Sequence, residues 1–326
     1  MTESGVLDLA EVLAARQRIA PYLRPTPLYA YPALDVMTGA RVWVKHENHQ
    51  PVGAFKVRGG VNLVSQLAPD ELRRGVIAAS TGNHGQSVAY AARLFGTRAV
   101  ICLPEQANPV KVDSLRALGA EVVFHGRDFD EAREHCEKLA AEHRYRYIHS
   151  GNEPDLVAGV ATYTLEILEA RPDIEVIVVP VGGGSGASGA CLVAKAVRPG
   201  IEVIGVQSQE APAAYRSWRA RSLVEDTTST FAEGLATRTA FELPQRILWE
   251  KLDDFVLVSD DALRAATRVM IEKTRNLVEP AGAAALAAVL ADPARFAGRT
   301  VAIVCSGGNI SPAQLVALWP PEPGSS

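Results

Sequence analysis

Cysteine is scarce in this chain of 326 residues, which contains only four: Cys102, Cys136, Cys191 and Cys305. They lie far apart and form no Cys-x-x-Cys pair, so the sequence predicts neither a zinc site nor a disulfide framework. No apolar run reaches about 18 residues, the length of a membrane-spanning helix. The acidic N-terminal segment also lacks the basic and apolar regions of a signal peptide. These absences favour a cytoplasmic protein.

The chain has no large excess of either charge, with 33 Lys and Arg against 37 Asp and Glu and a formal net charge of −4. Both signs are spread along the sequence, which leaves no basic stripe for a phosphate backbone and no polybasic run for a membrane surface. Nucleic acid and membrane are therefore not expected as partners. Hydrophobic residues make up 48% of the chain, and its length suits two globular domains of about 100 to 200 residues each.

Short runs of β-branched residues recur along the chain and alternate with helical stretches. Several runs are apolar throughout, as expected for strands that are buried on both faces of a parallel sheet. The alternation predicts an α/β protein with mainly parallel sheet. The predicted strands cover residues 41–47, 75–80, 98–104, 120–126, 145–151, 174–181, 201–207, 254–260 and 300–307.

A glycine-rich loop follows the predicted strand at 174–181 and precedes an amphipathic helix. It contains Gly182, Gly183, Gly184, Ser185 and Gly186. Without Cβ atoms, such a loop lets several backbone N–H groups converge on one anion at the positive end of the helix. The loop therefore predicts a phosphate site, although a tight turn between strand and helix is a competing interpretation.

Gly184, Gly186 and Gly189 also satisfy the G-x-G-x-x-G pattern of a dinucleotide site. That site needs an acidic residue at the end of the next strand, but the run at 201–207 ends in Gln207 followed by Ser208. Glu210 falls beyond the predicted strand. An NAD-type oxidoreductase is therefore weakened but remains an alternative.

A second polar stretch follows the predicted strand at 75–80 and begins a helix. Its members are Ser80, Thr81, Gly82, Asn83 and His84. Hydroxyl, amide and free N–H groups at a helix N-terminus make a good receptor for a carboxylate. An ordinary helix cap is the competing interpretation.

Two further residues come directly before or after apolar segments. Lys56 lies between Phe55 and Val57, where loss of hydration would lower the pKa of its amine and make it a nucleophile or base. Ser306 follows the last predicted strand, at the edge where parallel sheets bind ligands. Taken singly, a solvated lysine and a simple Ser-Gly-Gly turn are the more common situations.

Together these stretches resemble the fold-type II pyridoxal-phosphate enzymes, and within them the threonine/serine dehydratase and serine racemase group. The resemblance follows the family's order along nearly the whole chain. Its motifs are RPTPL (24–28), KHEN (45–48), GAFKVRGG (53–60), STGNHGQ (80–86), GGGSG (182–186), TFAEG (230–234), VEPAGAA (278–284) and SGGN (306–309).

The resemblance implies pyridoxal 5'-phosphate as cofactor, with Lys56 as the catalytic lysine that forms a Schiff base with it. Asn83 would bind the ring hydroxyl and Ser306 would face the pyridine nitrogen, while Glu279 matches a glutamate that faces the cleft. The implied cofactor-binding set is Phe55, Lys56, Asn83, Gly182, Gly183, Gly184, Ser185, Gly186, Glu279 and Ser306. The implied receptor for the substrate carboxylate is Ser80, Thr81, Gly82, Asn83 and His84.

The resemblance also implies two doubly wound open-sheet domains, as in the β subunit of tryptophan synthase. The larger would contain residues 1–52 and 153–326 and bind the cofactor, and the smaller would contain residues 53–152. A homodimer is expected. No metal site is expected, because Gln207 and Ala213 stand where related racemases have acidic ligands, and a hard cation needs such oxygens.

The implied activity is that of a dehydratase, an ammonia-lyase that converts a β-hydroxy-α-amino acid such as threonine or serine to a 2-oxo acid and ammonia. A bulkier substrate such as phenylserine, or an acidic one such as 3-hydroxyaspartate, stays open. A serine or amino-acid racemase is a second possibility, with Thr81 where racemases of this group carry a serine. A binding or scaffold protein that has kept the fold and lost catalysis is a third.

Overall fold

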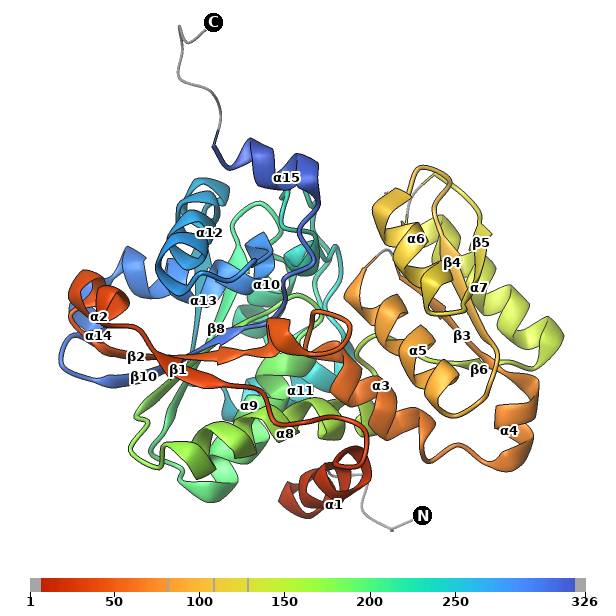
Figure 1. Ribbon diagram of the computed structural model, residues 1–326, viewed down its shortest axis with the longest axis horizontal. Coiled ribbons are helices and arrows are strands. Elements are labelled where there is room, and N and C mark those ends of the chain that lie inside the picture. The colour runs from red at the N-terminus through yellow and green to blue at the C-terminus, as the bar shows by residue number, and fades with distance from the viewer. Residues whose placement is uncertain (1–6, 81, 108, 128, 320–326) are drawn as a thin grey trace, which may run out of the picture.

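The computed structural model describes residues 7–80, 82–107, 109–127 and 129–319, which form two open sheets (Figure 1). The larger sheet has the strand order β1-β2-β10-β7-β8-β9 and the smaller β5-β4-β3-β6. All neighbouring strands pair in parallel except β1 and β2. The predicted α/β fold with parallel sheets is therefore confirmed.

The strands are β1 (Leu28–Ala30), β2 (Arg41–His46), β3 (Val76–Ala79), β4 (Ala99–Leu103), β5 (Glu121–Phe124), β6 (Arg146–Tyr147), β7 (Val176–Pro180), β8 (Glu202–Ser208), β9 (Asp254–Val258) and β10 (Thr300–Cys305). The helices before the glycine-rich loop are α1 (Leu9–Ile19), α2 (Pro32–Thr38), η1 (Glu47–His49), α3 (Lys56–Val64), α4 (Pro69–Arg74), α5 (Asn83–Leu94), α6 (Pro109–Ala117), α7 (Phe129–His143) and α8 (Pro154–Ala170). Those that follow it are α9 (Ser185–Val197), α10 (Ala213–Ala220), η2 (Glu233–Leu235), α11 (Glu242–Lys251), α12 (Asp260–Thr274), α13 (Pro280–Ala291), α14 (Pro293–Phe296) and α15 (Pro312–Ala317).

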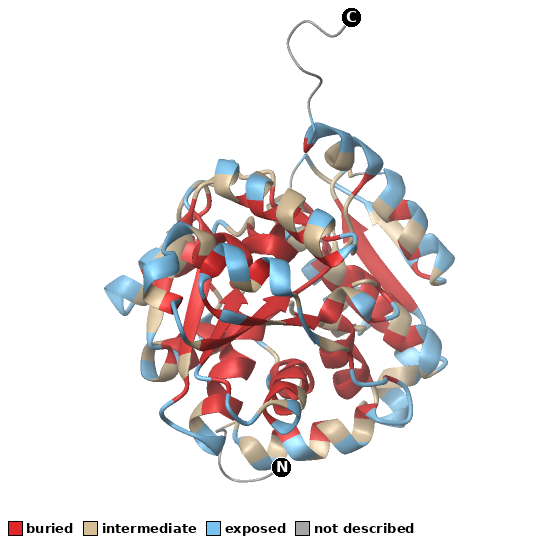
Figure 2. Cartoon of the chain, turned by 60° about the vertical axis from the view of Figure 1, so that its left-hand side comes forward, coloured by how far each residue is buried: buried red, intermediate tan, exposed pale blue. Residues whose placement is uncertain are grey.

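Helices cover both faces of the large sheet, and alternate residues of its central strands enter different cores. On β7, Ile177 and Val179 pack into a core with α8 and α9, whereas Val176 and Val178 pack into a second core with α12 and α13. Every residue of β7 and β10 is buried (Figure 2). This burial on both faces explains why these strands are apolar throughout.

The small sheet is also covered on both faces. Ile77 and Val100 pack with Cys136 beneath α7, while Val76 and Ile101 on the opposite face join the core that continues to α8 and α9. The shared core places the two sheets side by side. Along the chain, α3 precedes the strands of the small sheet and α8 follows them.

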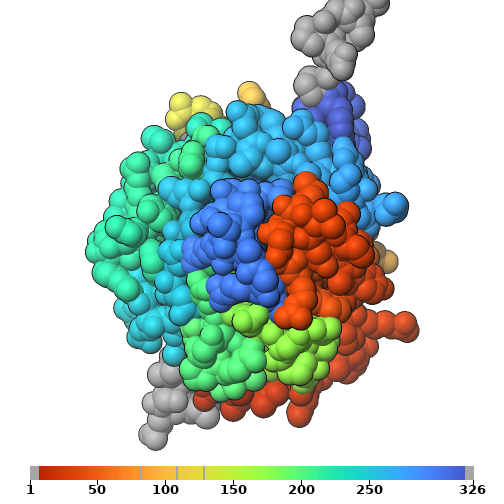
Figure 3. Space-filling view, turned by 90° about the vertical axis from the view of Figure 1, so that its left-hand side faces the viewer, coloured from red at the N-terminus to blue at the C-terminus, as the bar shows by residue number. Residues whose placement is uncertain are grey.

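The N-terminal and C-terminal parts of the chain meet in the large sheet, because β10 pairs with β2 and β7. Figure 3 shows the same meeting at the surface, where the segment around α2 (orange-red) lies against the segment around α14 (blue). No helix in the described part of the chain is long and apolar enough to cross a membrane.

Candidate active site

The amine of Lys56 lies at the junction of the two sheets. Lys56 is the first residue of α3, and its Nζ donates hydrogen bonds to the Ser150 carbonyl at 3.1 Å and to Ser185 Oγ at 2.9 Å. Ser185 begins α9, so the amine lies beside the predicted phosphate loop. Burial lowers the pKa of Lys56 to about 8, because the charged form is poorly hydrated there.

The glycine-rich loop connects β7 to α9, which has Gly184 at its N-cap with φ +90° and no side-chain cap. Its first two glycines are also required by packing. A Cβ on Gly182 would lie 2.2 Å from the Gly234 carbonyl oxygen, and one on Gly183 would lie 2.2 Å from the Phe241 ring. A Cβ on Gly186 would make only ordinary contacts. The uncapped start of α9 leaves backbone N–H groups for an anion.

Asn83, Glu279 and Asn309 form a hydrogen-bonded chain from α5 to the end of β10. Asn83 Nδ2 donates to Glu279 Oε1 at 2.7 Å, and Asn309 Nδ2 donates to Asn83 Oδ1 at 2.7 Å. Both amide contacts fix the orientation of the Asn83 side chain. Burial raises the pKa of Glu279, and the bond from Asn83 only partly offsets this.

Ser306 follows β10 and is 7% exposed. Its hydroxyl makes a long bond of 3.4 Å to the Ala281 carbonyl. The Ser306 carbonyl accepts the Phe55 N–H at 3.1 Å, which ties the residue before Lys56 to the end of β10. Lys56 and Ser306 are thus held by adjacent backbone segments, although they are far apart in sequence.

The predicted carboxylate receptor lies between β3 and α5. Ser80 and His84 are buried, and Ser80 Oγ accepts the Gly82 N–H at 3.2 Å. Thr81 lies outside the described residues. His84 Nε2 bonds the Ile148 carbonyl at 3.0 Å, which requires the proton on Nε2. Burial, followed by the charge of Lys56, lowers the pKa of His84 to about 3, so the imidazole is neutral.

The structure adds residues that the sequence patterns did not single out as site residues. Asn309 orients Asn83, Phe241 covers Gly183, and the Ser150 carbonyl accepts from Lys56. The position of Asn309, three residues after Ser306 at a strand end, was the available signal for it. Lys111 of α6 forms an ion pair with Glu233 of η2 and thereby joins the two sides of the site.

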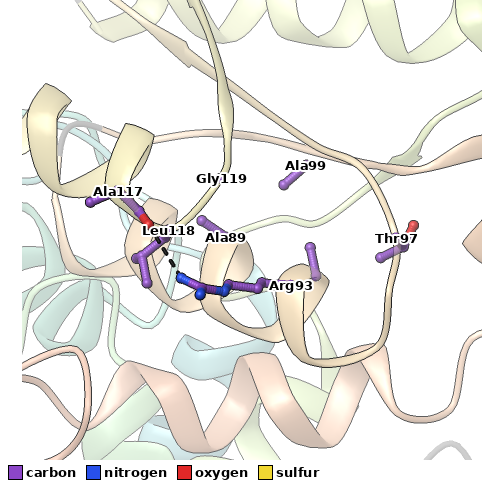
Figure 4. A pocket seen from close by; sticks show the side chains of 8 residues that line it. Ala89, Arg93, Thr97, Ala99, Ala117, Leu118 and Gly119 are labelled. Carbon is purple, nitrogen blue, oxygen red and sulfur yellow. Dashed lines mark hydrogen bonds between the residues drawn. The ribbon is translucent and has the colours of Figure 1, made fainter.

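Two cavities lie near or outside this site. One of about 80 Å³ lies beside Lys111 and Asn309, and Asn309 is the residue that donates to Asn83. Another of about 320 Å³ lies between α5 and α6 (Figure 4) and shares no residue with the predicted site. It is lined by Ala89, Ala92, Arg93, Thr97, Ala99, Ala117, Leu118 and Gly119.

The structure describes both residues that were considered for a metal site in the sequence, Gln207 and Ala213. Gln207 Oε1 accepts the Tyr215 N–H at 3.0 Å, and Ala213 is the first residue of α10. Within the described part of the chain, no group of three or more His, Cys, Asp and Glu residues is arranged to hold a metal ion.

The pKa of Lys56 leads to a pH-dependent reactivity. At pH 7 the neutral fraction of an amine with a pKa of about 8 is about 300 times that of an amine with a pKa of 10.5. We expect the rate at which the apoprotein captures an aldehyde at Lys56 to rise with pH and level off above about 8. Stopped-flow absorbance measures this phase, and the Lys56→Ala variant should lack it. A midpoint above 10 would contradict the burial of the amine.

Glu279 gives a prediction on stability. Its folded pKa is raised, so the folded state loses stability as the pH rises from the unfolded value, about 4.3, through the folded pKa. A glutamine can still accept the Asn83 bond without carrying charge. We expect Glu279→Gln to raise the thermal midpoint of the apoprotein by about 2–4 °C at pH 7 and to have little effect at pH 4. An equal effect at both pH values would contradict this explanation.

Residues 19–307 match the family model described as pyridoxal-phosphate dependent enzyme. The L-threonine ammonia-lyase of Thermotoga maritima is 37% identical over 306 residues, which cover 94% of this chain and 76% of that protein. The L-threo-3-hydroxyaspartate ammonia-lyase of Saccharomyces cerevisiae is 35% identical, with 92% of each chain covered.

Maize serine racemase matches in structure, with a TM-score of 0.91 and 32% identity over 95% of this chain and 96% of the racemase. The family match covers most of the chain and contains Lys56, the glycine-rich loop and Ser306. The chain therefore belongs to the pyridoxal-phosphate-dependent enzymes, and its cofactor is pyridoxal phosphate.

Proposed function

We propose that this enzyme dehydrates a β-hydroxy-α-amino acid of the threonine or serine type to a 2-oxo acid and ammonia. The observation that carries the proposal is the Lys56 amine, which is half-buried, has a pKa of about 8 and donates to Ser185 at the start of α9. Two of the similar proteins are named as ammonia-lyases of hydroxy amino acids. That agreement supports the reaction class.

The residues at this place fit pyridoxal phosphate. The uncapped N-terminus of α9 supplies N–H groups for the phosphate, and Lys56 supplies the amine within hydrogen-bond distance of Ser185. We propose that Gly182 to Gly186 hold the phosphate, Asn83 the ring hydroxyl and Ser306 the pyridine nitrogen. Phe55 and Glu279 complete the set beside the ring.

Pyridoxal phosphate supplies an electron sink for the charge left when a proton leaves the α-carbon of a bound amino acid. In our proposal the neutral Lys56 amine removes that proton, which its lowered pKa permits near neutral pH. The Lys56 ammonium is then placed to protonate the departing β-hydroxyl. The elimination releases one molecule of water. A later hydrolysis takes up one molecule of water and releases ammonia, so the overall reaction balances.

Two neutral groups shape this chemistry. The hydroxyl of Ser306 cannot keep the pyridine nitrogen fully protonated as an aspartate would, which favours elimination over transamination. In our proposal the substrate carboxylate binds at the start of α5. Its receptor would be Ser80, Thr81, Gly82 and Asn83. Because the His84 imidazole is neutral, it adds no positive charge to this receptor.

A substrate panel tests the proposal and its main competitor. Threonine, serine, phenylserine and 3-hydroxyaspartate are each assayed for ammonia, for 2-oxo acid and for inversion at the α-carbon. We expect ammonia and 2-oxo acid in equal amounts from at least one of them. Inversion without ammonia would instead support a racemase, the candidate favoured by the match to maize serine racemase.

We also propose a homodimer in the cytoplasm, with residues 53–152 as the small domain. All four cysteines are free and buried, which suits a reducing compartment. The four strands of the small sheet fall within 53–152, and Val36 and Met37 are exposed apolar side chains on the large-sheet side. Sedimentation equilibrium tests the dimer, which a mass of one chain would contradict.

A further inference from the structure

A buried group of four charged residues adjoins the helix that carries Lys56, and the proposed reaction does not use it. Lys45 comes from β2, Glu47 from η1, Arg58 from α3 and Glu166 from α8. The side chains of Lys45, Glu47 and Arg58 are at most 1% exposed, and that of Glu166 is 13% exposed. Two cations face two carboxylates. We refer to these four residues as the Arg58 cluster.

Arg58 binds both carboxylates through two contacts each. Its Nε and Nη2 donate to Glu47 at 2.7 and 2.9 Å. Its Nη1 and Nη2 donate to Glu166 at 2.6 and 2.8 Å. Because the guanidinium group is planar with donors in fixed directions, these contacts define both its position and its plane. Lys45 donates to Glu166 at 2.5 Å but, as a compact ammonium, imposes no such plane.

Stability alone is a weak explanation for this cluster. Buried ion pairs can commonly be replaced by packed apolar side chains with little loss, because hydration of the charges is given up on folding. What a doubly bidentate arginine adds is a defined geometry. The cluster therefore fixes the part of α3 from which Arg58 projects.

Lys56 lies two residues before Arg58, in the first turn of the same helix, which has no side-chain cap. The preceding residues are tied to the end of β10 by the Phe55 N–H to the Ser306 carbonyl and by a bridge between Ala54 and Gly307. These ties run to the large sheet, as the contacts of the Arg58 cluster do, and the cluster adds Glu166 of α8. On the other side, Ser87 Oγ of the small-sheet helix α5 donates a hydrogen bond to the Lys56 carbonyl at 2.7 Å.

We propose that Arg58 is a positioning residue that fixes α3, and with it the Lys56 amine, to the large sheet. The proposal rests on the proposed role of Lys56 as the lysine that binds the cofactor. Although α3 lies within residues 53–152, the cluster holds it against β2, η1 and α8. In this position the Lys56 amine lies within hydrogen-bond distance of Ser185 at the start of α9.

The test compares Arg58→Lys with Lys45→Met in the apoprotein and the cofactor-loaded protein. Arg58→Lys keeps the charge on α3 but loses the planar contacts, whereas Lys45→Met removes a cation of the same cluster outside α3. Three properties are measured: the thermal midpoint, the rate and pH midpoint of pyridoxal phosphate capture by Lys56, and amide hydrogen exchange in α3.

For Arg58→Lys we expect capture to slow by about 10-fold to 100-fold, with a shifted pH midpoint and faster exchange in α3. For Lys45→Met we expect a lower thermal midpoint with capture within about 2-fold of the unchanged protein. If Arg58→Lys does not fold, Glu166→Gln replaces it, and a smaller loss of capture in the same direction is expected.

Equal capture by Arg58→Lys and the unchanged protein would overturn the positioning role. So would losses of capture that simply follow the thermal midpoint in both variants. If the unchanged protein captures no pyridoxal phosphate at Lys56, the proposed function itself fails, and the positioning role fails with it.

Discussion

Replacing Lys56 by alanine should reduce ammonia release by at least about 10⁴-fold, because one side chain serves as cofactor nucleophile and as base for the α-proton. The fold should persist, since among the described residues the Lys56 amine donates just two hydrogen bonds, to Ser150 and Ser185. Ammonia release from the best substrate and absorbance of the bound cofactor measure the two roles separately.

The matched control for this variant is Lys195→Ala. Lys195 lies in the last turn of α9, at the opposite end from Ser185, and forms an ion pair with Asp253. We expect the control to keep its cofactor absorbance and its turnover within about 2-fold, as is usual for substitutions away from a site. Turnover above a tenth of normal in Lys56→Ala would contradict the proposed mechanism.

Gly182→Ala should be the most damaging substitution in the glycine-rich loop. Its Cβ would lie 2.2 Å from the Gly234 carbonyl oxygen, a backbone atom that cannot rotate away. We expect the free energy of unfolding to fall by about 1–3 kcal/mol, the usual cost of overpacking. Cofactor affinity should fall as well, because the loop must shift. Urea unfolding and cofactor titration measure the two losses.

Two further variants separate this steric effect from a general loss of glycine. A Cβ on Gly200 would meet nothing within 4 Å, so Gly200→Ala should change the free energy of unfolding by no more than about 0.5 kcal/mol. In Gly183→Ala the conflict is with the Phe241 ring, so adding Phe241→Ala should restore part of the cofactor affinity. Similar losses in Gly182→Ala and Gly200→Ala would contradict the steric account.

The parallel strands were predictable because burial on both faces leaves a direct trace in the sequence. The apolar runs at 174–181 and 300–307 became β7 and β10, the most buried strands of the large sheet. β1 was missed, since it is a three-residue antiparallel edge strand with little burial and no alternating pattern. The strand predicted at 145–151 is only Arg146–Tyr147, because His149 Nδ1 accepts the N–H groups of Gly151 and Asn152 and turns the chain.

The sequence proposed positions for the candidate site but not the contacts between them. Asn83 and Glu279 each stand at a helix start, yet the hydrogen bond between them joins positions 196 residues apart. The Arg58 cluster was not predicted, because Lys45 and Glu47 in KHEN and Arg58 in GAFKVRGG meet Glu166 of α8 only in the folded chain. The glycines at 182 and 183 suggested a phosphate loop, but their packing against Gly234 and Phe241 became visible only in the folded chain.

The most direct test of the central claim is to locate the lysine that carries the cofactor. The purified protein is loaded with pyridoxal phosphate, reduced with borohydride, digested and mapped by mass spectrometry. We predict that the reduced cofactor is found on the peptide containing Lys56 and that Lys56→Ala abolishes this modification. Modification of another lysine instead, or none after loading, would contradict the account.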